Sequence, residues 1–198
     1  AGYTLARIND ENEDLNRLLD GKVISGDGIE DGKVNFEKLI EWFHQNPDEE
    51  DDGTWTWSAH VCHSWTPESN TAFVMLIHDM INQTVDVQEP YRGYMEDNMR
   101  NATRYFVKME KDNSWPEGDD KAMARALALW GLKAFAMPSE GVTTQQIEDT
   151  KAALKEWLIE EQKKGTDGSW PAGSPYGWYD GGRKTEATAY AVLALNAT

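Results

Sequence analysis

Apolar residues recur at the spacing of an α-helix through most of the chain. Phe36, Leu39, Ile40 and Phe43 stand at positions i, i+3, i+4 and i+7, which places them on one face of a helix over about 35–45. Comparable apolar stripes predict a short helix near 14–19 and longer helices over about 66–81, 90–111, 119–135, 143–164 and 185–195. The pattern therefore predicts an all-α protein.

Capping residues mark several of these helix ends. Thr66-Pro67-Glu68 supplies an N-cap, a proline at the first helical position and an acid in the first turn. Thr143 and Gln146 have the spacing of a capping box, and Gly165 suits a C-cap. Thr185 is predicted to cap the last helix. The helix over 119–135 is apolar almost all round, which predicts an inner, buried position.

A tetrapeptide of one kind occurs three times between these helices. The copies are Asp52-Gly53-Thr54-Trp55, Asp112-Asn113-Ser114-Trp115 and Asp167-Gly168-Ser169-Trp170. Each follows an amphipathic stretch and precedes an apolar one, which indicates stacked α-hairpins. We expect glycine or asparagine to allow a sharp turn and tryptophan to pack the two helices together. The prediction is one domain over 1–198, with an N-terminal helix at 1–32 and repeat units at about 33–82, 88–136 and 142–198.

Charge and composition exclude some classes of partner. The net charge is −16 and the pI is about 4.5, which argues against nucleic acid and anionic membrane surfaces as partners. No run approaches the 18 apolar residues of a membrane span. Asn-x-Thr triplets at Asn82, Asn101 and Asn196 favour an extracellular or cell-surface location.

Two segments carry residues that could bind a metal, although no cofactor is predicted. His60, Cys62 and His63, with His78 as a fourth ligand, could hold zinc; the alternative is a loop with ordinary histidines. The segment 27–38 resembles a calcium loop, but Ile29 and Lys38 stand where two ligands are needed. The alternative there is a glycine-rich turn before a helix.

Aromatic residues gather in the loops that follow the tetrapeptides. Trp57 and Trp65 lie in the first loop, and Trp178 and Tyr179 lie in the third. If these loops meet at one end of the helices, their rings and nearby carboxylates could bind a glycan. The alternative is that the tryptophans fill space between inner and outer helices.

The outer helix, Asp-Gly-Ser-Trp turn and alanine-rich inner helix together resemble the α/α-toroid superfamily. The resemblance covers roughly 35–198 and looks closest, over 153–195, to the thioester domain of alpha-2-macroglobulin and complement proteins. That domain's Gly-Cys-Gly-Glu-Gln motif is absent, because the single cysteine is Cys62. The resemblance implies a partial or small toroid, whose open edges would be covered by extra residues, flanking domains, a partner or another copy.

Terpene cyclases of the same superfamily suggest one catalytic hypothesis. Glu117-Gly118-Asp119-Asp120 resembles their Asp-x-Asp-Asp motif, which would make Asp119 the acid that protonates an alkene and Asp120 its partner. Such an acid must be kept neutral by burial. The alternative is that Asp119 caps a helix and Asp120 interacts with its dipole.

These observations lead to two hypotheses of function. The first is a non-catalytic interaction module of an extracellular or cell-surface protein, of macroglobulin or cyclase-repeat type, with a protein or glycan partner. The alternative is an enzyme, either a cyclase-like acid catalyst using Asp119 or a carbohydrate-active toroid using the loop tryptophans and acidic residues.

Overall fold

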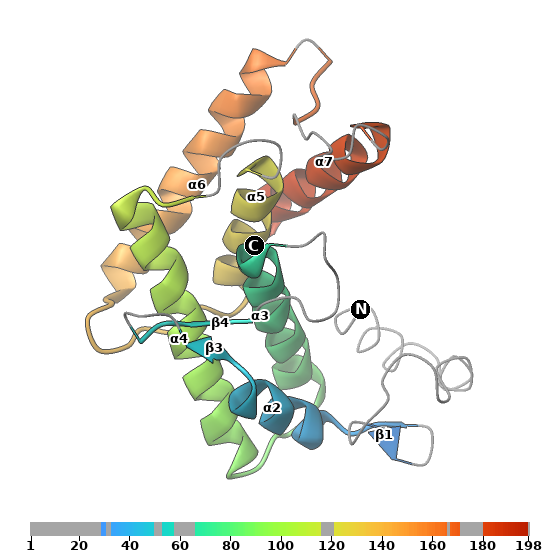
Figure 1. Cartoon of the computed structure of the whole chain (residues 1–198), viewed down its shortest axis with the longest axis vertical. Helices are drawn as coiled ribbons and strands as arrows, with labels where there is room; N and C mark the ends of the chain where they lie inside the picture. The colour runs from blue at the N-terminus through green and yellow to red at the C-terminus, as the bar shows by residue number, and fades with distance from the viewer. Residues whose placement is uncertain are drawn as a thin grey trace.

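The long elements that the structure describes are all helices (Figure 1). The computed structural model describes residues 29–30, 33–49, 53–57, 66–115, 121–165, 167–170 and 180–197. The helices are α2 (Phe36–Gln45), α3 (Pro67–Thr84), α4 (Tyr91–Asp112), α5 (Lys121–Phe135), α6 (Thr144–Lys164) and α7 (Asp180–Asn196). The predicted all-α class is thus confirmed. No described helix is both long enough and apolar enough to cross a membrane.

Two short antiparallel β-hairpins accompany the helices within the described ranges. Strand β1 (Ile29–Glu30) pairs with β2 (Lys33–Val34), and β3 (Asp48–Glu49) pairs with β4 (Trp55–Thr56). The first hairpin lies inside the segment compared above with a calcium loop. Asn35, which lies within that segment, caps α2 by accepting a hydrogen bond from the Lys38 N–H (3.0 Å). Asp27 and Asp31 lie outside the described residues.

The predicted caps are confirmed at two helix starts and one helix end. Thr66 accepts a hydrogen bond from the Ser69 N–H, and Pro67 follows it as the first residue of α3. Thr143 and Gln146 form both bonds of a capping box, and Gly165 is the C-cap of α6. The prediction for α7 was wrong, because that helix begins at Asp180 rather than after Thr185. Gly181 and Gly182 have low helix propensity, which favoured the later start in the sequence.

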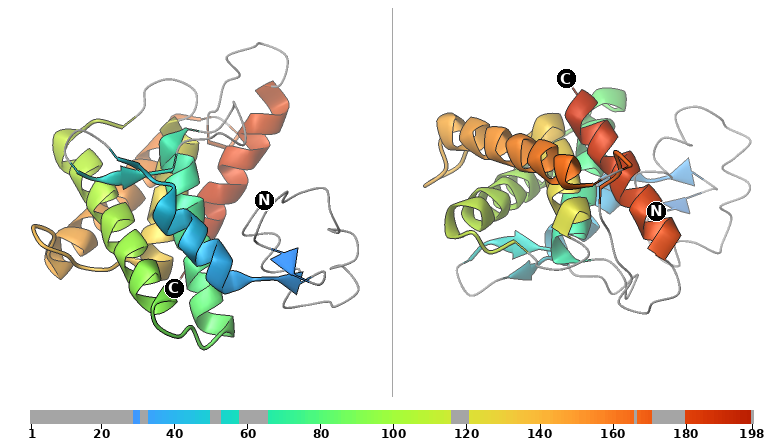
Figure 2. Two further views of the ribbon diagram at one scale, coloured as in Figure 1. Left: turned by 60° about the horizontal axis from the view of Figure 1, so that its bottom comes forward. Right: turned by 90° about the horizontal axis from the view of Figure 1, so that it is seen from above.

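The helices form two rows that alternate along the chain. In one row α4 lies between α2 and α6, and in the other α5 lies between α3 and α7. Figure 2 shows α4 and α6 on one side of α5, whereas α7 lies on the opposite side of α5. Helices α3, α5 and α7 run in the same direction (Figure 1). The core fills the space between the rows, and its largest fully buried side chains include Trp170, Phe106, Met75 and Leu127.

Helix α5 is buried around most of its circumference, as its sequence predicts. Ten of its residues are buried, among them Ala122, Ala126 and Gly131. The close contact with α3 depends on Gly131: a Cβ atom there would lie 3.3 Å from the Ala72 carbonyl oxygen and 3.3 Å from the Met75 sulfur. The absence of a side chain at this position lets the two helix backbones approach each other.

Replacing Gly131 by valine is expected to lower the free energy of unfolding by about 2 kcal/mol, because overpacking of a core costs about 1–3 kcal/mol. The Ala72 carbonyl belongs to a helix backbone and cannot move aside cheaply. Gly93→Val in α4 is the matched control, since a Cβ there would meet only the flexible end of the Glu89 side chain. Urea unfolding of both variants measures the difference; equal stabilities would contradict this account of the α3–α5 contact.

Candidate functional site

The second residue of each tetrapeptide adopts the predicted turn conformation. Gly53, Asn113 and Gly168 have φ angles of 73°, 49° and 75°. These left-handed values favour glycine and, next, asparagine. The three turns are therefore alike at this residue, and each belongs to a connection that runs from one row of helices to the other.

Trp170 fixes the third turn between its two helices. Its side chain is 2% exposed. The indole Nε1–H donates to the Leu158 carbonyl of α6 (2.7 Å), and the Trp170 backbone N–H donates to the Thr188 hydroxyl of α7 (3.2 Å). One residue therefore bonds α6 through its side chain and α7 through its backbone.

Trp57, one of the predicted glycan-binding residues, occupies the corresponding position in the first unit. Its side chain is 4% exposed. Its indole N–H donates to the Phe43 carbonyl of α2 (2.9 Å), and its backbone N–H donates to the Thr71 hydroxyl of α3 (3.4 Å). Trp57 thus makes the bonds of Trp170, although the tetrapeptides align Trp55 with Trp170. Strand β4 accounts for the two extra residues, and the Trp57 ring packs in the core.

In the second unit the equivalent tryptophan takes part in a charged cluster instead. Trp115 is 5% exposed, and its indole N–H donates to Glu110 (2.7 Å). The Arg125 guanidinium lies over the rings of Trp115 and Trp157, at 5.3 and 4.2 Å from their centroids. Burial lowers the pKa of Arg125, while the charges of Glu110 and Glu161 oppose that shift. The cluster connects the turn, α5 and α6.

Glu161 of α6 completes this cluster with two lysines. Its carboxylate is buried and contacts the ammonium groups of Lys164 (2.7 Å) and Lys121 (3.0 Å). The hydrogen bond from Lys164 is the main cause of a lowered Glu161 pKa, although burial acts in the opposite direction. The paired charges fit a role in holding α5 against α6.

His78 of α3 lies in a chain of hydrogen bonds across three helices. It is fully buried. Its Nδ1 lies 2.7 Å from the Val74 carbonyl and so donates, while its Nε2 accepts from the Asn98 amide (3.1 Å). The side-chain oxygen of Asn98 in turn lies 3.4 Å from Nδ1 of His44. Both ring nitrogens of His78 are engaged, so neither offers a lone pair to the zinc site for which it was considered.

Glu68 is a buried carboxylate in the first turn of α3. One of its oxygens accepts a hydrogen bond from the Tyr105 hydroxyl (3.1 Å), and the other is buried without a partner among the described residues. Burial of an unpartnered oxygen is unusual in a native protein. Glu68 is not among the predicted site residues, because nothing in its local sequence distinguishes it from other acids in the first turn of a helix.

The remaining predicted site residues lie outside the described part of the chain. They are Asp119 and Asp120, the aromatic residues Trp65, Trp178 and Tyr179, and the zinc candidates His60, Cys62 and His63. Their segments each lead into one of the three helices that run in the same direction. Within the described ranges, no three His, Cys, Asp or Glu residues gather as a metal site.

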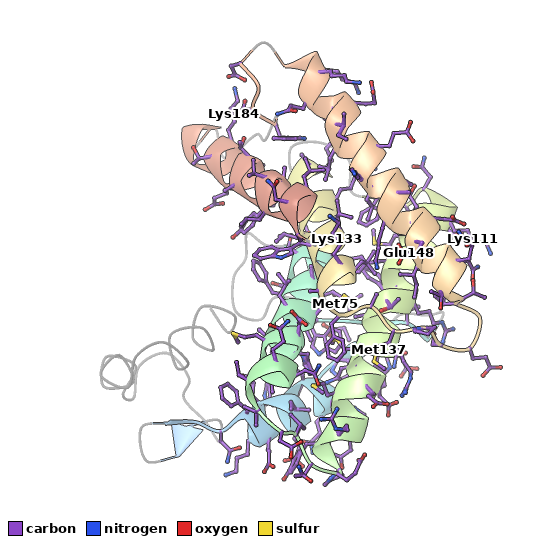
Figure 3. The ribbon with its side chains drawn as sticks, turned by 180° about the vertical axis from the view of Figure 1, so that it is seen from behind. Met75, Lys111, Lys133, Met137, Glu148 and Lys184 are labelled. Carbon is purple, nitrogen blue, oxygen red and sulfur yellow. The ribbon has the colours of Figure 1, made fainter. Side chains whose placement is uncertain are left out.

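The open face of α7 carries a shallow groove of about 680 Å³. Lys184, near the start of α7 (Figure 3), pairs with Asp167 of the turn (2.6 Å). Hydrogen bonds from Lys184 and Ser169 hold the Asp167 pKa well below its usual range. Along the helix the groove continues over Thr188, Ala189, Val192 and Leu193. Val192 and Leu193 are each 46% exposed. The groove is therefore polar at the Asp167 end and mainly apolar along the rest.

Sequence reasoning missed this groove, although its signal was present. Thr185, Thr188, Ala189, Val192 and Leu193 follow the helical spacing i, i+3, i+4, i+7 and i+8. A second stripe, Ala187, Ala191 and Ala194, is fully buried. Two apolar stripes on one helix indicate two packing faces, and in the part of the chain that the structure describes, helices cover the alanine face and leave the other exposed.

Comparison of the chain with protein-family models, curated proteins and solved structures gives no match.

Proposed function

We propose that the protein is a non-catalytic interaction module of α/α-toroid type, part of an extracellular or cell-surface protein of macroglobulin or cyclase-repeat type. The two alternating rows of helices support a toroid-like arrangement. The recurrence of the Trp57 bonds at Trp170 supports stacked hairpins as its units. The exposure of Asn82 in its Asn-x-Thr triplet supports glycosylation and hence secretion.

The open face of α7 is the single observation that best supports an interaction function. Its neighbour in the row, α5, is covered by α3, α6 and α7. In contrast, Val192 and Leu193 stand nearly half exposed, next to Ala189, along a groove that extends to the Asp167 turn. Contiguous apolar surface with a polar rim is typical of a protein-binding site. The partner proposed for this groove is therefore a protein.

Photo-crosslinking from position 192 tests this function. A benzophenone amino acid replaces Val192, and the protein is expressed in the cells that normally produce it. Irradiation is expected to give one discrete crosslinked polypeptide, identified by mass spectrometry. The same probe at Glu156, an exposed position of α6, is the control. Absence of a product at 192, or equal products at both positions, would contradict the proposal.

A further inference from the structure

The exposed face of α7 has a covered counterpart in α3, and the two can be compared residue by residue. Thr71 and Thr188 each accept a hydrogen bond from the backbone N–H of the tryptophan that precedes their helix. This shared bond sets the register between α3 and α7. Ala72, Met75 and Leu76 of α3 then correspond to Ala189, Val192 and Leu193 of α7.

In α3 these positions hold the next helix of the row. Ala72 and Met75 are the residues against which Gly131 of α5 packs, and Ala72, Met75 and Leu76 are 0–2% exposed. In α7 the corresponding residues are exposed, with Val192 and Leu193 each at 46%. The surface that receives α5 on α3 is thus repeated on α7, where no described helix covers it.

We infer that the α7 face docks an α-helix of the same kind as α5, presented by an α-hairpin of a partner protein. The partner helix carries glycine or alanine where it crosses Ala189, because a larger side chain would hold the two backbones apart, as it would at Gly131 where α5 meets Ala72. Apolar side chains on either side of that small residue cover Val192 and Leu193. This inference rests on the proposed interaction function and names the chemistry of the partner.

A second copy of this chain does not fit as the occupant. Its own small-residue helix, α5, is enclosed by α3, α6 and α7, so it is not available to another molecule. Two copies would also bring net charges of −16 together, and like-charge juxtaposition opposes association. Charge complementarity favours a partner of basic net charge, whose encounter rate would fall as salt is added.

The test uses a peptide with the α5 sequence as the probe. A fluorescent peptide of residues 121–135 is held helical by a hydrocarbon staple between positions 122 and 126, which lie opposite Gly131 at 100° per residue. Fluorescence anisotropy with the full chain is expected to show saturable binding. Hydrogen exchange is expected to slow in α7 on binding.

Two changes should each weaken this binding at least tenfold. One is Val192→Gln with Leu193→Gln in the chain; the other is Gly131→Leu in the peptide, which leaves the chain unaltered. Trp42→Gln is the matched control, because Trp42 is an exposed apolar residue on α2 (51%); it should leave the affinity within twofold. Circular dichroism checks that the chain variants remain folded.

Several results would overturn the inference. These are no binding of the peptide, equal binding of its Gly131→Leu form, or affinity unaffected by the α7 double variant. If position 192 nevertheless crosslinks to one polypeptide, the interaction function stands and only the helical partner is rejected. If both experiments fail, the proposed function falls with the inference.

Discussion

Replacement of Trp170 by alanine is expected to lower the free energy of unfolding by about 4 kcal/mol, since Trp→Ala in a core costs about 3–5 kcal/mol. The indole is 2% exposed and packs between α6 and α7. Its removal leaves a cavity and also eliminates the hydrogen bond to the Leu158 carbonyl. Urea unfolding followed by far-ultraviolet circular dichroism measures the loss.

Two further variants separate the contributions to this loss. Trp170→Phe retains a large ring but lacks the indole N–H, and it should cost about 1–2 kcal/mol, from one hydrogen bond and imperfect packing. Trp42→Ala removes a tryptophan that is 51% exposed and should cost under about 1 kcal/mol, in line with surface substitutions. If Trp42→Ala and Trp170→Ala cost the same, Trp170 does not have the structural role described above.

Acidification is expected to destabilise the fold through His78. Burial lowers the pKa of His78 from 6.5 to about 4. Between these two values the unfolded chain binds a proton at this ring and the folded chain does not, so stability falls as the pH falls. The contribution of His78 is fully present above pH 6.5 and is lost as the pH falls through about 4. It amounts to about 3 kcal/mol, from 1.36 kcal/mol for each pKa unit.

The His78→Gln variant isolates this effect from the titration of other groups. The stability difference between wild type and variant is measured at several values between pH 7 and pH 4. It should shift against the wild type by about 3 kcal/mol over that range. NMR titration of the His78 ring should give a pKa near 4. A difference that does not change with pH, or a ring that titrates near 6.5, would show that His78 is not enclosed as described.

The sequence predicted those parts of the fold that depend on local interactions. Thr66 and Thr143 begin helices and Gly165 ends one through contacts within a few residues, so their types and spacing are sufficient to predict them. The left-handed turn residues could also be predicted locally, because glycine and asparagine are the residues that tolerate positive φ. The apolar circumference of α5 likewise predicted its burial.

The missed features depend on interactions between distant parts of the chain. Trp55 fits the tetrapeptide, but Trp57 makes the bonds to α2 and α3 because the pairing of β3 with β4 shifts the chain by two residues. The buried bond between Asn98 and His78 likewise joins residues of two helices. Nothing local distinguishes the exposed stripe of α7 from a covered one, since exposure depends on whether another helix lies beside it.

Because the helices alternate between two rows, each pair can unfold partly independently of the others. The last pair, α6 and α7, contacts α4 and α5, and α7 is anchored by small alanines on one side. Helices that contact mainly their neighbours can unfold approximately as a one-dimensional array, in which one pair separates before the rest. A helix bound to α7 would enclose this pair between two neighbours. Binding of such a helix should therefore make the unfolding of α3, α5 and α7 more cooperative.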